Sequence, residues 1–140
     1  MILHCNYEEL QALRSGARSM LDDNPENRCA VAAYESRKAG VEALVPHLEG
    51  DLDFRTLGEL RNVSSGIATI VECLRAEMDS VVIATHPAHE NAVAAYFDYA
   101  HAYSVLGRLR ELDHQMESMI EVVIGGRPDE RVIREFVFPD

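Results

Sequence analysis

The stretch "TLGELRNVSSGIATIVECLRAEMDSVVIA", residues 56–84, decides the fold class that the sequence predicts. Thr56, followed three positions later by Glu59, is a capping-box pattern of the kind that begins a helix. The apolar residues that follow form one narrow stripe with helical spacing for about seven turns. They are Leu60, Val63, Ile67, Ile70, Val71, Leu74, Met78 and Val81. The stretch therefore predicts a long helix.

A second long helix is expected directly after it. "THP" at residues 85–87 interrupts the pattern, helical spacing then runs from about Pro87 to Val123, and Gly125 and Gly126 end it. At 1.5 Å per residue the two helices would be roughly 42 and 54 Å long. A compact chain of this length would be only about 37 Å across. The pair therefore predicts an elongated antiparallel hairpin.

The second long helix carries two apolar stripes on opposite sides. In its first half the apolar side is Val93, Tyr96, Ala100 and Tyr103. In its second half a 4-3-4-3-4 stripe lies on the side that was polar before, which implies two packing partners. This second stripe is Val105, Leu109, Leu112, Met116, Met119 and Val123. We expect the preceding helix to bury the first stripe, and a second copy of the chain to cover the second one. Coverage by the first helix of the same chain is the competing explanation.

The remaining segments complete a bundle of about four helices. "NYEELQALRSGARSML" opens with a capping-box pair, Asn6 and Glu9, and continues as an amphipathic helix. Pro25 could open another helix at its first position. Residues 28–49 favour a helix that Pro46 ends or kinks, although "CAVAAY" within them could also form a short strand. The two ends, "MILHC" and "RVIREFVF", are β-branched or aromatic, which predicts a small strand pair joining the termini or a short terminal helix. The predicted fold is mainly α, a single domain over residues 1–140.

Composition limits the classes of function. The net charge of −11, from 13 basic and 24 acidic residues, argues against a nucleic-acid partner. Three cysteines, far apart and odd in number, do not favour a disulfide framework or a structural zinc site, and Cys73 is expected to be an inert thiol. There is no signal-peptide pattern and no apolar run of about 18 residues, so we expect a cytoplasmic protein without a membrane partner.

Residues 85–101, "THPAHENAVAAYFDYAH", hold the weak candidates for a metal site: His86, His89, Asp98 and His101. Pro87 fits the first position of a helix, which makes Thr85 or His86 its N-cap. His101 would lie about 16 Å further along the helix, too far to share a ligand set with the first two histidines. The histidines are therefore interpreted as structural, and neither a metal nor a cofactor is expected.

No nucleophile, phosphate-binding or zinc-protease motif occurs in the sequence. The functional hypothesis is a non-enzymatic protein that acts through protein–protein interaction as a homodimer. The alternative is a small all-α enzyme or metal-binding protein that uses His, Asp and Glu residues of the long helix. A third hypothesis is a binder of a basic protein, which the acidic charge permits.

Overall fold

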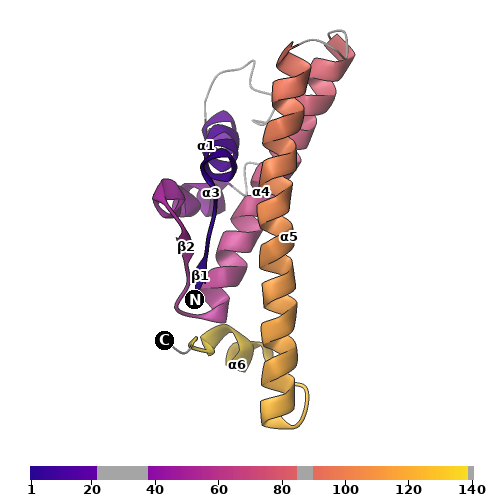
Figure 1. The fold of residues 1–140 in the computed structure, drawn as a ribbon. Helices are drawn as coiled ribbons and strands as arrows, with labels where there is room; N and C mark the ends of the chain where they lie inside the picture. The colour runs from indigo at the N-terminus through magenta and orange to yellow at the C-terminus, as the bar shows by residue number, and fades with distance from the viewer. Residues whose placement is uncertain (22–37, 85–89, 139–140) are drawn as a thin grey trace.

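The computed structural model describes residues 1–21, 38–84 and 90–138, and over these residues the protein is mainly α (Figure 1). The helices are α1 (Tyr7–Leu21), α3 (Lys38–Leu44), α4 (Leu57–Ala84), α5 (Glu90–Ile124) and α6 (Glu130–Glu135), with a short 3₁₀ helix η1 (Val45–Glu49). Two short strands, β1 (Ile2–Leu3) and β2 (Leu52–Asp53), form an antiparallel pair. The predicted fold class is confirmed.

Helices α4 and α5 form the elongated hairpin that the sequence predicts, and they run side by side through the molecule (Figure 1). The Oγ1 of Thr56 accepts a hydrogen bond from the backbone N–H of Glu59 at 3.1 Å, as expected for a cap. The carboxylate of Glu59 accepts from the N–H of Arg55 at 2.7 Å. At the far end of α5, Gly125 adopts a φ of 79°, and its N–H donates to the carbonyl of Glu121. Both helix ends therefore follow local sequence signals.

The apolar stripe of α4 forms the centre of the core. The six residues of that stripe from Leu60 to Leu74 are buried, and Met78 is half-buried. Helix α1 crosses α4 at Gly16, where an added Cβ would collide with the side chain of Ile70 and approach that of Leu74 at 3.1 Å. The core is thus shared by α1, α4 and α5, with α3 packed on α4.

Part of the segment 28–49 can be compared with its prediction. Residues 38–49 are helical, with Pro46 placed in the first turn of η1, so the change of helix at Pro46 is confirmed. The strand alternative for "CAVAAY" and the helix expected from Pro25 lie outside the described residues.

The strand pair expected between the termini is wrong in its partners. β1 pairs with β2, in the register Ile2 with Asp53 and Leu3 with Leu52. The C-terminal tail forms the short helix α6, which confirms the alternative of a terminal helix, and then returns to the same segment, where Val137 bridges Thr56. Both ends of the chain therefore pair with residues 52–57, because this extended segment offers free backbone groups on both sides.

Candidate interaction surface

The stripe predicted as an interface, in the second half of α5, is largely used inside the chain. Val105 and Leu109 are fully buried, Met116 is 8% exposed and Leu112 is half-buried. The covering elements are α4 and α1, which make the two most extensive contacts with α5. The last two members differ, since Met119 is 41% and Val123 is 79% exposed. Association through this stripe stays a prediction, and only its exposed end is open to a partner.

The expectation that the first-half stripe of α5 is buried is wrong. Val93, Tyr96 and Tyr103 are 44%, 57% and 54% exposed, and Ala100 is only half-buried. The inner side of this half is formed instead by Ala102, which is buried, and by its half-buried neighbours. A single helix cannot turn both stripes inward, and the aliphatic stripe is the one that α1 and α4 cover.

The exposed stripe extends by one further helical step to Gly107, which is also exposed. We call Val93, Tyr96, Ala100, Tyr103 and Gly107 the outer stripe. The side chain of Phe97, 54% exposed, lies beside it. Successive members are three or four residues apart, so they occupy one face of α5.

Contacts between rings hold several aromatic side chains of this region in place. The rings of Tyr96 and Phe97 meet edge to face with their centroids 6.1 Å apart. Those of Tyr99 and Tyr103 lie 5.8 Å apart. Such pairs favour particular ring positions. The exposed aromatic surface is therefore partly ordered before any partner arrives, which lowers the entropic cost of binding.

The outer stripe carries no charge. Between Val93 and Gly107 the only Asp, Glu, Lys or Arg is Asp98, and Asp98 is half-buried. Burial raises the pKa of the Asp98 carboxyl above its ordinary value, while the nearby His101 lowers it. The same Asp98 lies close enough to raise the pKa of Glu77 on α4, whose pKa burial raises most. Asp98 and Glu77 thus lie near one another at the contact between α5 and α4.

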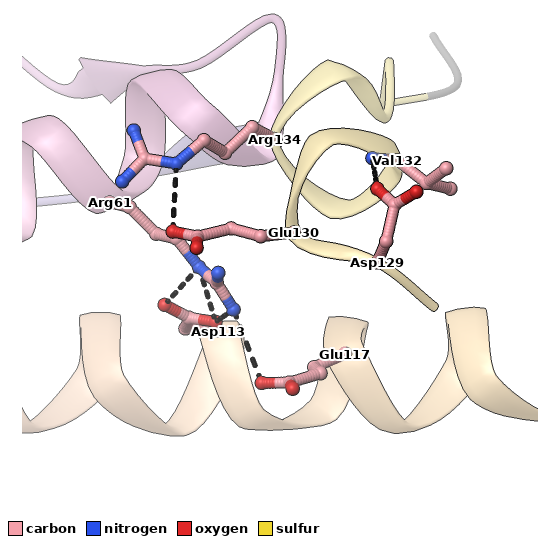
Figure 2. Close-up of polar contacts among 7 residues, drawn as sticks. All are labelled: Arg61, Asp113, Glu117, Asp129, Glu130, Val132 and Arg134. Atoms are coloured by element: carbon pink, nitrogen blue, oxygen red, sulfur yellow. Dashed lines mark hydrogen bonds and ion pairs between the residues drawn. The ribbon is translucent and has the colours of Figure 1, made fainter. Parts of the chain in front are cut away.

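Ion pairs fix the rotation of α5 about its axis (Figure 2). Arg61 of α4 donates to Asp113 at 3.0 Å and to Glu117 at 3.1 Å, which raises the pKa of its guanidinium. Figure 2 also shows α6 beside this cluster, with Asp129 capping α6 and Glu130 paired with Arg134. The ion pairs of Arg61 with Asp113 and Glu117 lie on the inner side of the second half of α5. They therefore keep the outer stripe turned away from the core.

A second set of polar contacts ties α5 to the start of α1. The guanidinium of Arg108 donates to the carboxylate of Glu9 and, at 2.9 Å, to the carbonyl of His4. Glu9 is 5% exposed and also accepts from the N–H of Asn6 at 2.9 Å, which completes the predicted capping box. Sequence reasoning did not find this pair, because nothing in the local pattern links residues 99 positions apart.

The weak metal candidates are not brought together in the described residues. Asp98 and His101 share α5, and the Nδ1 of His101 lies 2.7 Å from the carbonyl oxygen of Phe97, to which it donates. His86 and His89 lie outside the described residues. Within residues 1–21, 38–84 and 90–138 no group of three or more His, Cys, Asp or Glu side chains could hold a metal ion.

A groove of about 570 Å³ lies between α3, η1 and α4. Its polar lining includes His47, Asp53, Glu59 and Asn62. Glu59 is engaged as a helix cap, as described above. The groove has the volume of a small-molecule site, and its lining also includes Ser65 and Thr69, of which the Thr69 hydroxyl donates to the carbonyl of Ser65 at 3.1 Å. The alternative hypothesis of a small all-α enzyme would have to be tested at this groove.

The cysteines differ from expectation. Cys73 is fully buried and disulfide-bonded, which corrects the interpretation as an inert thiol. Cys5 is a free thiol, and burial followed by the nearby carboxylate of Glu9 raises its pKa.

In the described part of the chain, no helix has the length and apolar character needed to cross a bilayer. No protein-family model, no curated protein and no solved structure matches this chain.

Proposed function

We propose that this protein acts through protein–protein interaction, as a homodimer, and has no catalytic role. The observation that carries the proposal is the outer stripe of α5 with Phe97 beside it. Three aromatic side chains there are each more than half exposed, on a helix whose opposite side is packed in the core. A soluble chain seldom leaves a contiguous aromatic surface open unless that surface binds something.

Two further features support an interaction role. The surface is built on a helix that ion pairs hold against α1 and α4. Rigid aromatic side chains are the residues that contribute most to protein interfaces, because little entropy is lost when they are fixed.

The test is the mass of the protein in solution together with its metal content. Light scattering at tens of micromolar should give twice the 15.6 kDa of one chain. Elemental analysis of the dialysed protein should give less than one equivalent of zinc, iron or manganese. A monomer at this concentration would contradict the homodimer. A full equivalent of metal, lost in His101→Ala, would instead support the alternative of a metal-binding protein that uses Asp98 and His101.

The cytoplasmic location is a separate part of the proposal, and one finding opposes it. That finding is the disulfide at Cys73, because disulfides are typical of oxidising compartments. Trapping thiols in lysed cells with an alkylating reagent decides between a cytoplasmic location and an oxidising compartment. A reduced Cys73 in cytoplasmic extract would support the proposed location, and a fully oxidised one would overturn it.

A further inference from the structure

We infer that two copies of this chain pack antiparallel along the outer stripe of α5. The inference rests on the proposed homodimer. Among the described residues the outer stripe is exposed, and three features of it favour a second copy as the molecule that covers it.

The first feature is the order of large and small side chains. The spacing of the outer stripe is 3-4-3-4, which is the seam of a coiled coil. Its small or β-branched members, Val93, Ala100 and Gly107, take one seam position, and Tyr96 and Tyr103 take the other. The stripe therefore alternates a small surface with an aromatic ring.

Antiparallel packing makes this alternation complementary to itself. In one register, Ala100 lies opposite Tyr103 of the second copy and Gly107 lies opposite its Tyr96, and the two-fold axis repeats both pairs. Each ring then covers a position with little or no side chain, as close packing requires. A parallel pair would place tyrosine against tyrosine and glycine against glycine, which leaves gaps between crowded layers. The sequence of the stripe thus favours the antiparallel arrangement.

The second feature is charge. Each chain carries a net charge of −11, so two copies repel one another over most of their surface. The outer stripe is free of charged residues, and it is therefore a face on which two such chains can approach. A basic partner, by contrast, would need carboxylates at the contact, and the one carboxylate between Val93 and Gly107, that of Asp98, is half-buried instead.

The third feature is area. Aromatic side chains offer about 150–250 Å² each, so Tyr96, Phe97 and Tyr103 together expose roughly 250–400 Å² on each copy. A standard interface buries about 800 Å² per partner. With the small residues of the stripe added, the contact stays below the roughly 600 Å² per partner at which stable interfaces begin, and it has the size of a weak or transient one. The expected dimer is consequently of low affinity, with a dissociation constant in the micromolar range.

The test uses a substitution that blocks the contact between the two copies and at the same time stabilises helix α5. Gly107 is exposed in the interior of α5, and a Cβ added there meets no atom within 4 Å. Gly107→Glu therefore removes a helix-weakening glycine while placing a charged side chain where Tyr96 of the second copy would lie. Sedimentation should show a folded monomer, with the dissociation constant raised at least tenfold.

Val122→Glu is the matched control. Val122 is 81% exposed on the same helix and belongs to the other apolar surface, near the end of α5 with Met119 and Val123. This variant should remain dimeric with the wild-type dissociation constant. If Val122→Glu dissociates and Gly107→Glu does not, the homodimer stands and the outer stripe is overturned as its interface. A monomeric wild type at tens of micromolar overturns the homodimer and the interface together.

Discussion

The carboxylate of Glu9 is 5% exposed, yet each of its oxygens has a donor. One oxygen accepts from the N–H of Asn6 at the start of α1, and the other from the guanidinium of Arg108 on α5. A carboxylate removed from water in this way is stable only while its donors remain. The residue therefore links a local helix cap to a long-range contact that orients α5.

Replacement of Arg108 tests this link. Arg108→Met keeps most of the aliphatic stem but leaves the Glu9 carboxylate buried without its cation. Unfolding in urea should show a loss of about 2 kcal/mol, the contribution of a hydrogen bond to a buried charged group. Arg75→Met, at an exposed position of α4, should change the free energy of unfolding by less than about 0.5 kcal/mol. Equal effects of the two substitutions would contradict the role of Arg108.

The half-buried Asp98 predicts a dependence on pH. Its pKa is raised in the folded protein, so the folded state holds the proton more tightly than the unfolded state. Its contribution to stability is therefore fully present below the ordinary pKa of 3.8 and is lost as pH rises through the raised value. Asp98→Asn should accordingly be more stable than wild type at pH 7, with the difference shrinking on acidification to pH 3.8. A variant less stable than wild type at pH 7 and equal to it in acid would contradict the raised pKa.

For single residues, the sequence predicts helix caps better than it predicts long-range ion pairs. The partners at Asn6 and Glu9, and at Thr56 and Glu59, are three residues apart, so a short pattern identifies them. The ion pair of Arg108 with Glu9 forms only because α5 packs against α1. The acidic and basic residues of the sequence would allow many other pairs, and tertiary packing determines which of them form.

Helices α1, α4 and α5 meet through close approaches that only some positions permit. At Gly16, α1 comes so near α4 that a Cβ would collide with Ile70, whereas at Gly107 the surface of α5 is open. The same substitution should therefore have opposite effects at these two glycines, although both lie inside helices.

Gly16→Ala should lower the free energy of unfolding by about 1–3 kcal/mol, because the added methyl group overpacks the α1–α4 crossing. Gly107→Ala should raise it by up to about 1 kcal/mol, since alanine is the better helix former and nothing obstructs it. Urea unfolding at low protein concentration measures both. A stabilised Gly16→Ala would mean that the two helices are further apart than described.

The long helices were predictable, and the side of α5 that faces the core was not. Both stripes of α5 have helical spacing, so periodicity alone gives them equal weight. The distinguishing signal was chemical: the second stripe is aliphatic, whereas the first carries two tyrosines, whose hydroxyl groups remain hydrated when exposed. The pairing of β1 with β2 was equally unpredictable, because strands of two residues are too short to show an alternating pattern in the sequence.

For the molecule as a whole, the disulfide at Cys73 and the free thiol at Cys5 define a covalent state that can be measured. In denaturant without reductant, an alkylating reagent should label Cys5 and leave Cys73 unlabelled. After reduction both should be labelled. In the native protein the raised pKa of Cys5 should make its labelling at pH 8 slower than that of an unfolded thiol. Labelling of Cys73 before reduction would contradict the disulfide.

The elongated hairpin was predicted from the length of its two helices, because both are longer than the diameter of a compact chain of this size. Where its uncovered surface lies followed only from the structure, which turns the outer stripe away from α1 and α4.

A distance between two copies of the chain tests the antiparallel dimer directly. A spin label at Gln115→Cys, an exposed position of α5, with Cys5 replaced by serine, reports on the dimer by pulsed electron paramagnetic resonance. In the antiparallel register each label lies about 20 Å along the helix from the two-fold axis, so the two labels should be about 40 Å apart. A distance under about 20 Å, as a parallel pair would give, or no intermolecular distance at all, would contradict the account.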